Sequence, residues 1–120
     1  MAFKFDKSQR LLCAKMYQSV FTGFDGKVHS EHFLLFYRRN NLSHPRLGLA
    51  VTKKKIRQAV KRNCIKRHTR EFFRLNANLP FVDCVLIVKK GFNDNQVYQE
   101  LSEIFAKLER LNINNFYADP

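Results

Sequence analysis

Glycine and proline are scarce in this sequence, with four and three residues among 120, and tryptophan is absent. Such a composition excludes collagen-like and low-complexity chains. Hydrophobic residues make up 45% of the chain, including 12 phenylalanines, which is enough for a packed core. A chain of this length fits one domain, which we expect to span 1–120 with a tail at about 112–120.

Long apolar runs are also missing. No stretch approaches the roughly 20 apolar residues of a membrane-spanning helix, and the start of the chain lacks the uninterrupted apolar segment of a signal peptide. The cysteines Cys13, Cys64 and Cys84 are odd in number and form no C-x-x-C pair, so we expect reduced thiols. These absences favour a cytoplasmic protein that has no membrane partner.

Acidic residues are few. The chain has 10 Asp and Glu against 22 Lys and Arg, which gives a net charge of +12 and an isoelectric point near 10.0. This excess indicates a polyanionic partner, with nucleic acid favoured over an anionic membrane. The segment 53–74, KKKIRQAVKRNCIKRHTREFFR, holds ten Lys or Arg and one acid, Glu71, so it carries +9 of the +12.

Hydrophobic periodicity predicts elements in the order α-β-β-β-α-β-α. We expect helices at about 9–21 with Ser8 as cap, at about 55–75, and from a cap among residues 93–95 to about 111. We expect strands at about 27–30, 32–38, 47–52 and 83–89. Apolar strands with amphipathic helices predict a two-layer α/β sandwich of the α+β class. The last two strands and the helix between them can form a parallel crossover, which general rules make right-handed.

The basic helix has one polar and one apolar face when its residues are placed at about 100° intervals. The polar face holds Asn63, Arg67, Arg70 and Arg74, with Lys66 at its edge. The apolar face holds Ile65, Thr69 and Phe72, which can pack on the sheet. Solvated helix faces usually mix charges of both signs, because like charges one turn apart repel. This nearly uncompensated face therefore favours phosphate binding over simple solvation.

Two of the predicted strands suggest a second binding surface. Leu34 and Phe36 share one face of their strand, and the small residues Gly48, Ala50 and Thr52 share one face of the next. If these faces coincide, they form a groove that Tyr17 and Phe21 of the first helix can wall. An aromatic groove beside cations can hold single-stranded nucleic acid by stacking. The alternative is ordinary core packing under the helix, and composition alone favours it.

Patterns of metal-binding and catalytic residues are missing. Cys64 and His68 lie one helical turn apart, but no further ligand follows at a zinc-binding spacing. The sequence has no glycine-rich phosphate loop, and no acid–base pair stands out. We therefore expect no catalytic residue and no metal site in the protein.

The run LGLAVTKK…AVKRNCIKRHTREFFR resembles the signature of the bacterial ribonuclease P protein subunit. In that family a glycine-containing strand leads to a Ser/Thr-Lys-Lys turn and then to a helix with Arg-Asn-Arg, Ile-Lys-Arg and further arginines. The matching residues are Thr52, Lys53, Lys54, Arg62, Asn63, Ile65, Lys66, Arg67 and Arg70. Cys64 departs from the pattern, because the family usually has arginine there and a bidentate phosphate contact is lost.

The resemblance implies a ribosomal-protein-like α/β sandwich with a left-handed crossover at the basic motif. It also implies a subunit of ribonuclease P, the endonuclease that removes the 5′ leader of precursor tRNA. In such an enzyme the RNA subunit is catalytic and binds the Mg²⁺, while the protein has no cofactor of its own. The implied partners are ribonuclease P RNA and the precursor tRNA leader.

The resemblance assigns two sets of binding residues and reverses the preference for a plain core under the first helix. Contacts to the catalytic RNA are expected from Lys53, Lys54, Lys61, Arg62, Asn63, Lys66, Arg67, Arg70 and Arg74. The leader cleft is expected at Tyr17, Phe21, Leu34, Phe36, Ala50 and Thr52.

Three other functions compete with this one. A ribosomal RNA-binding or assembly protein would share the charge and the fold without stimulating cleavage, but the KRNCIKR context argues against it. A self-contained metal-dependent nuclease needs a carboxylate cluster, and the basic segment has only Glu71. A helix-turn-helix DNA-binding protein fits poorly, because the basic helix is expected between strands.

Overall fold

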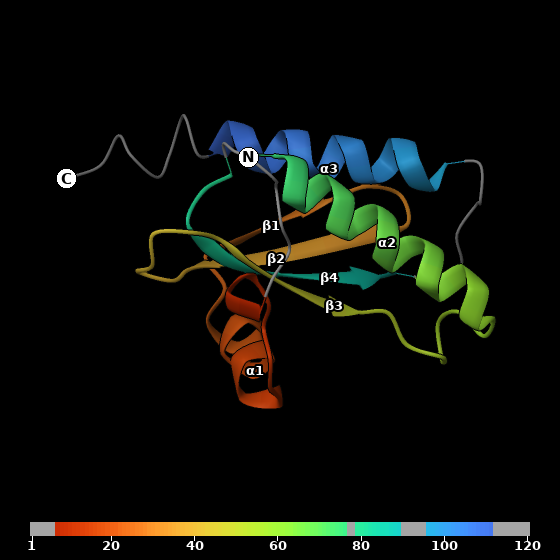
Figure 1. Ribbon diagram of the computed structural model, residues 1–120, viewed down its shortest axis with the longest axis horizontal. Coiled ribbons are helices and arrows are strands. Elements are labelled where there is room, and N and C mark those ends of the chain that lie inside the picture. The colour runs from red at the N-terminus through yellow and green to blue at the C-terminus, as the bar shows by residue number, and fades with distance from the viewer. Residues whose placement is uncertain (1–6, 77–78, 90–95, 112–120) are drawn as a thin grey trace.

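The computed structural model describes residues 7–76, 79–89 and 96–111 (Figure 1). Its elements are η1 (Lys7–Gln9), α1 (Ala14–Gly23), β1 (Gly26–His29), β2 (Phe33–Arg39), β3 (Arg46–Ala50), α2 (Ala59–Leu75), β4 (Val82–Val88) and α3 (Val97–Leu111). The predicted order of helices and strands is confirmed. The expected cap at 93–95 and the tail at 112–120 lie outside the described residues.

The first helix begins later than predicted. Ser8, the expected cap, belongs to the short 3-10 helix η1, and Cys13 stands at the N-cap of α1 without a capping hydrogen bond from its side chain. Between the two helices, Arg10 forms a parallel bridge with Leu47, and the backbone N–H of Leu11 donates to the Leu47 carbonyl oxygen at 3.0 Å. This pairing with the edge of β3 takes the segment out of the helical conformation.

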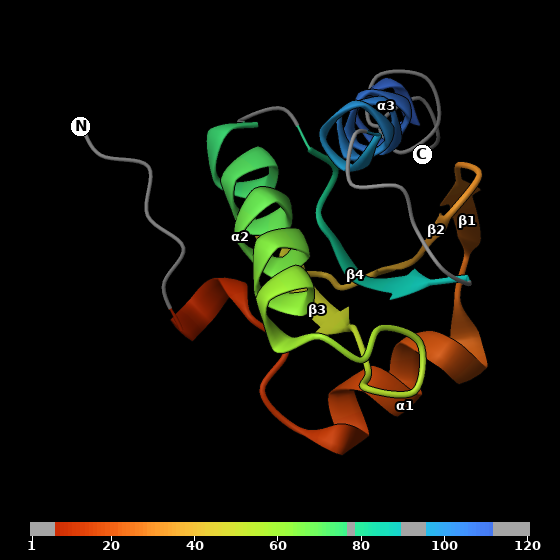
Figure 2. The same ribbon diagram turned by 90° about the vertical axis from the view of Figure 1, so that its right-hand side faces the viewer.

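The strands form one four-stranded sheet in the order β1-β2-β4-β3. The pairs β1–β2 and β2–β4 are antiparallel, whereas β3 and β4 are parallel and are connected through α2. Seen from the side of α2 with both strands pointing up, β4 lies to the left of β3 (Figures 1 and 2). The crossover is therefore left-handed, as the family resemblance implied and against the general rule.

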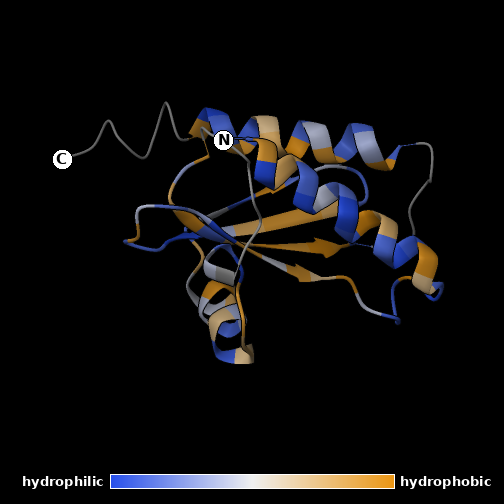
Figure 3. Cartoon of the chain, in the orientation of Figure 1, coloured by the Kyte–Doolittle hydropathy of each residue, from blue (hydrophilic) through white to orange (hydrophobic). Residues whose placement is uncertain are grey.

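Helices α2 and α3 cover one face of the sheet, and α1 covers part of the other (Figure 2). The main core lies between the sheet and the α2–α3 layer and includes the fully buried Phe33, Leu86 and Phe105. Figure 3 shows apolar strands beneath helices that carry polar residues along their length. The sheet and the α2–α3 layer form the predicted sandwich, and α1 adds a smaller cluster around Val20 and Val85.

A polar network ties α3 to the turn between β1 and β2. The buried Glu100 accepts hydrogen bonds at Oε1 from the Ser30 hydroxyl (2.6 Å) and the His32 backbone N–H (2.8 Å), and its Oε2 lies 2.6 Å from His32 Nδ1. Burial acts to raise the pKa of the Glu100 carboxyl, but the hydrogen bonds from Ser30 and His32 outweigh it and lower the pKa. A charged Glu100 therefore fixes the start of α3 against the sheet.

Candidate nucleic-acid interface

The loop between β3 and α2 contains the first part of the basic segment. The backbone N–H groups of Lys55 and Ile56 donate to the Thr52 carbonyl oxygen at 3.2 and 3.0 Å, which turns the chain directly after β3. Ile56 is buried and anchors the loop, whereas Lys53 and Lys54 are exposed. The predicted helix start at 55 was too early, because this turn precedes the true start of α2 at residue 59.

The outward face of α2 is polar and cationic, as predicted. Its exposed side chains include Asn63, Arg67 and Arg70. On the opposite side Ile65 and Thr69 are buried, and the Thr69 hydroxyl donates to the Ile65 carbonyl oxygen at 2.7 Å, which satisfies it inside the core. Phe73 continues the buried stripe, whereas the predicted Phe72 is only half-buried and faces α3.

The protein itself engages two of the predicted RNA-binding arginines. Arg62 donates from Nη1 to the carbonyl oxygens of Ile56 and Arg57 at 2.9 and 2.7 Å, so it holds the preceding loop against α2. Arg74 pairs with Glu71, with Nη2 at 2.9 Å from both carboxylate oxygens. These two guanidinium groups therefore have a structural role in addition to their charge.

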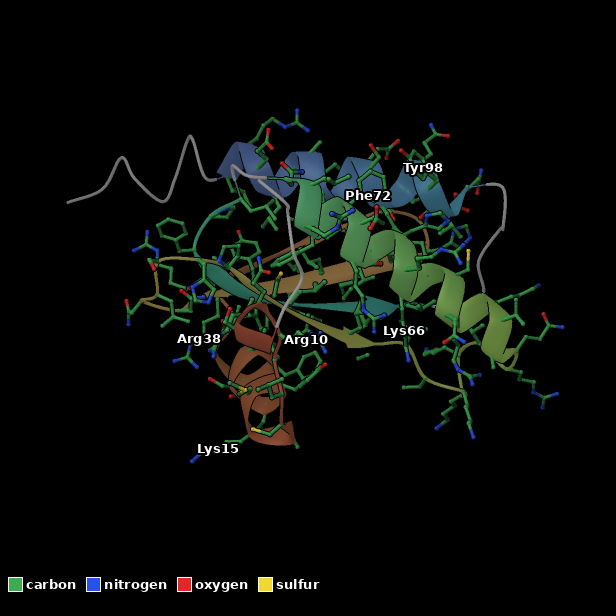
Figure 4. All side chains as sticks on the ribbon, in the orientation of Figure 1. Arg10, Lys15, Arg38, Lys66, Phe72 and Tyr98 are labelled. Carbon is green, nitrogen blue, oxygen red and sulfur yellow. The ribbon has the colours of Figure 1, made fainter. Side chains whose placement is uncertain are left out.

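Three other cations of α2 lack such compensation. In the described part of the chain, no acidic side chain forms an ion pair with Lys66, Arg67 or Arg70. Figure 4 places Lys66 on the side of α2 away from α3, and Lys61 on the same helix is half-buried. Uncompensated cations on one helix face create a positive surface that suits phosphate groups.

The second candidate surface lies on the α1 side of the sheet. The strand register aligns two rows of residues across β2, β4 and β3: Phe36–Val85–Gly48 and Leu34–Ile87–Ala50. The Leu34/Phe36 face and the small-residue face of β3 therefore coincide, which meets the condition for the predicted groove. Thr52 is exposed in the turn beyond the end of β3, so the register does not bring it into either row.

Tyr17 and Phe21 of α1 border these rows in different ways. Tyr17 lies against Gly48, and its hydroxyl accepts a hydrogen bond from the Leu49 backbone N–H at 3.0 Å. Phe21 packs edge-on against Phe36 with ring centroids 5.5 Å apart, yet 39% of Phe21 remains exposed. Tyr17 is thus part of the packing, whereas Phe21 keeps part of its ring surface exposed.

Phe24 is an aromatic residue of this surface that the sequence prediction missed. It follows the last turn of α1, is 42% exposed, and has its ring centroid 4.9 Å from that of Phe36. A signal was present in the sequence, since Phe21 and Phe24 are three residues apart and such residues lie on one side of a helix. We call Phe21, Phe24 and Phe36 the aromatic cluster.

The described residues hold no group of three or more His, Cys, Asp or Glu side chains that could bind a metal ion. The cysteines are free: Cys13 is exposed, Cys64 is half-buried and Cys84 is buried. Burial, with a smaller contribution from the charge of Asp83, raises the pKa of the Cys84 thiol, so this sulfur is not an activated nucleophile. Within the same residues, no helix is both long and apolar enough to cross a membrane.

Known proteins share both the sequence and the fold. The ribonuclease P family profile matches residues 5–111. A ribonuclease P protein component of Vibrio campbellii is 47% identical over 107 residues, covering 88% of this chain and 89% of the relative. One from Pseudomonas paraeruginosa is 43% identical over 110 residues, covering 88% and 82%.

Two solved structures agree with these relatives. The RNase P protein of Staphylococcus aureus matches this chain with a TM-score of 0.73 at 27% identity. The match covers 85% of this chain and 98% of the S. aureus chain. That of Thermotoga maritima has a TM-score of 0.67 at 27% identity, with coverage of 82% and 96%. The basic helix, the left-handed crossover and these matches lead to one conclusion. The chain belongs to the ribonuclease P protein family, the protein subunits of the endonuclease that processes the 5′ ends of tRNA.

Proposed function

We propose that the chain binds the RNA subunit of ribonuclease P through α2 and the loop before it, and that the 5′ leader of precursor tRNA lies against the aromatic cluster. The observation that carries this proposal is the separation of two surfaces. The uncompensated cations Lys66, Arg67 and Arg70 lie on one side of the sheet, and the aromatic cluster lies on the other. Each surface suits a different nucleic acid.

On the RNA side, the cations Lys53, Lys54, Lys66, Arg67 and Arg70 contact phosphates in this proposal, and all but the half-buried Lys66 are exposed. Lys61 and Arg62 add positive charge behind them, and Arg62 also holds the loop against α2. Arg74, the last residue of the predicted set, shares its charge with Glu71. Asn63 lies between the cations and supplies an amide that can both donate and accept hydrogen bonds. Neutralised phosphates release counterions, so binding should weaken steeply with salt.

On the leader side, single-stranded nucleotides stack on the exposed rings of Phe21 and Phe24. Leu34, Ile87 and Ala50 form an apolar floor beside them, and all three are only partly buried. The chain then runs from Ala50 through Thr52 into the loop between β3 and α2, where Lys53 and Lys54 are exposed. Residues 50–54 contain no acidic side chain, so the leader backbone can pass from the aromatic cluster to the cations along this segment.

The protein supplies no catalytic group in this proposal. Mg²⁺ is held mainly by the RNA subunit, and the net charge of +12 lowers the repulsion between the catalytic RNA and its RNA substrate. Mg²⁺ ions can then fill their sites on the RNA at a lower bulk Mg²⁺ concentration. Both partners are cytoplasmic RNAs, so the proposal also places the chain in the cytoplasm.

The test is cleavage of a precursor tRNA at low Mg²⁺ by a bacterial ribonuclease P RNA, with and without the protein. The expected result is stimulated cleavage at the mature 5′ end, with no cleavage by the protein alone. Binding of the RNA without stimulation would instead favour a ribosomal-type RNA-binding role. Cleavage by the protein alone would place the chemistry in the protein and contradict the proposal.

A further inference from the structure

A pocket of about 400 Å³ opens between α2 and α3, next to the cationic face of α2. Its lining consists of Arg67, His68, Glu71, Phe72, Leu75 and Tyr98. Figure 4 shows Phe72 of α2 and Tyr98 of α3 close together where the two helices meet. Pockets of this size that combine apolar rings with a few polar groups are typical of small-ligand sites.

The aromatic side chains of the pocket leave one ring available. Tyr98 packs against Phe72 with ring centroids 4.8 Å apart and against His68 with centroids 5.7 Å apart, nearly at a right angle. Even so, 61% of Tyr98 is exposed, as is 56% of Leu75 on the other helix. Tyr98 is thus fixed in orientation by two neighbours while much of its surface remains open to a planar partner.

The polar side chains of the pocket favour an anionic ligand. Arg67 belongs both to this pocket and to the outward face of α2, so the pocket adjoins the proposed phosphate-binding surface. The one acid, Glu71, has both carboxylate oxygens at 2.9 Å from Arg74 Nη2, so a neighbouring cation offsets its charge. An RNA strand that follows the cations of α2 therefore meets the pocket without facing an unpaired carboxylate.

Charge also decides between possible occupants. A second copy of this chain would bring another net charge of +12 toward the cations of α2, which opposes association. RNA offers phosphates for the arginines and a flat apolar base for the ring. We infer that the pocket takes one unpaired nucleobase of the partner RNA, stacked on Tyr98, while the adjoining phosphates contact Arg67 and Arg70. The inference rests on the proposed RNA binding by α2 and adds a base-stacking contact to it.

The first test compares three variants for binding to a bacterial ribonuclease P RNA over a range of salt concentrations. Tyr98→Ala should weaken binding about tenfold, because a stacked base is lost, but should leave the salt slope unchanged, because no phosphate contact is removed. Tyr98→Phe keeps the ring and should bind like the wild type. Ser102→Ala, at an exposed position one turn further along α3, is the matched control and should also bind normally.

The second test locates the base by chemical probing of unpaired nucleotides in the same RNA. Wild type and Tyr98→Phe should change the reactivity of one unpaired nucleotide, and Tyr98→Ala should not. Unchanged affinity and probing pattern for Tyr98→Ala, with wild type bound normally, would overturn this inference alone. A Tyr98→Ala effect on self-association but not on RNA binding would assign the pocket to a second copy and overturn it too. Failure of the wild type to bind the RNA would overturn the proposed function, and this inference with it.

Discussion

Tyr17 lies so close to Gly48 that a Cβ atom at position 48 would lie 2.8 Å from the phenol ring. The same ring reaches the edge strand β3, where its hydroxyl accepts the Leu49 backbone N–H at 3.0 Å. These two contacts join α1 to the sheet and fix the distance between them. Because Phe21 is one turn further along α1, they also set the position of the aromatic cluster.

Gly48→Ala should therefore destabilise the protein and displace α1. Overpacking of this kind typically costs about 1–3 kcal/mol, since the added methyl group meets the Tyr17 ring, which its hydrogen bond to Leu49 holds in place. The measurement is urea unfolding of Gly48→Ala, Tyr17→Ala and the double variant. The methyl group should cost less once the ring is absent. Strictly additive costs would show that the two residues are not coupled.

The elements that were predicted well from the sequence are those whose pattern is local. Alternation along β2 and helical spacing along α2 and α3 identified the elements, and the spacing also identified the buried face of α3 and most of that of α2. The predicted starts of two helices were wrong because contacts outside those helices decide where they begin. Residues 10–11 pair with β3, and the turn before α2 depends on the Thr52 carbonyl and on burial of Ile56.

In the candidate site, too, local patterns were predicted and features that depend on contacts between elements were not. The cationic face of α2 followed from helical spacing. Alternation gave the separate faces of β2 and β3, but their coincidence depends on the register of both strands with β4. The contact of Arg62 with two loop carbonyls requires the loop to fold back, which spacing does not reveal. Phe24 was missed because α1 was predicted to end at Phe21. The pocket at Tyr98 joins two helices far apart in the sequence, so no motif could indicate it.

Phe21→Ala should weaken binding of precursor tRNA more than binding of mature tRNA, by roughly tenfold for the loss of one stacked base. The physical reason is that Phe21 presents an exposed ring beside Phe36 on the proposed leader surface. Affinities of the holoenzyme for the two tRNAs would be compared. Leu42→Ala, at an equally exposed residue of the loop between β2 and β3, should leave the ratio unchanged. Equal losses for both tRNAs would point to a core role for Phe21.

Arg70→Ala should weaken binding to ribonuclease P RNA and reduce the salt slope by about one unit or less, as expected for one lost phosphate contact. Arg70 is exposed on α2 and has no acidic partner in the described part of the chain. Arg110→Ala removes the same charge from the last turn of α3 and controls for net charge. Similar slopes for the two variants would mean that total charge, not the α2 face, governs binding.

Stability should fall in acid because of Glu100. Its pKa in the folded protein lies below the ordinary value near 4.5, so its contribution is complete above that pH and is lost as the pH falls through the folded-state pKa. Urea unfolding between pH 3 and pH 7 measures this decline. Glu100→Gln should flatten it and cost about 1–3 kcal/mol at pH 7, because an amide satisfies fewer of the partly buried donors of Ser30 and His32.

The control for this prediction is Glu103→Gln, which removes a carboxylate from an exposed position one turn along the same helix. It should keep the acid-dependent decline of the wild type. A decline that is equally steep in Glu100→Gln would assign the acid sensitivity to other carboxylates, such as Asp83 in its pair with Arg46.

Cys64→Arg should strengthen RNA binding, since it restores the arginine that the family resemblance leads one to expect. Cys64 is half-buried on α2 between the exposed Asn63 and the buried Ile65, so a long side chain can extend its guanidinium to the surface. One added phosphate contact should steepen the salt slope by about one unit. Cys13→Arg adds the same charge at the start of α1 and should change the slope less. If both arginines act alike, position 64 lies outside the RNA contact, and the departure from the family pattern has no cost for binding.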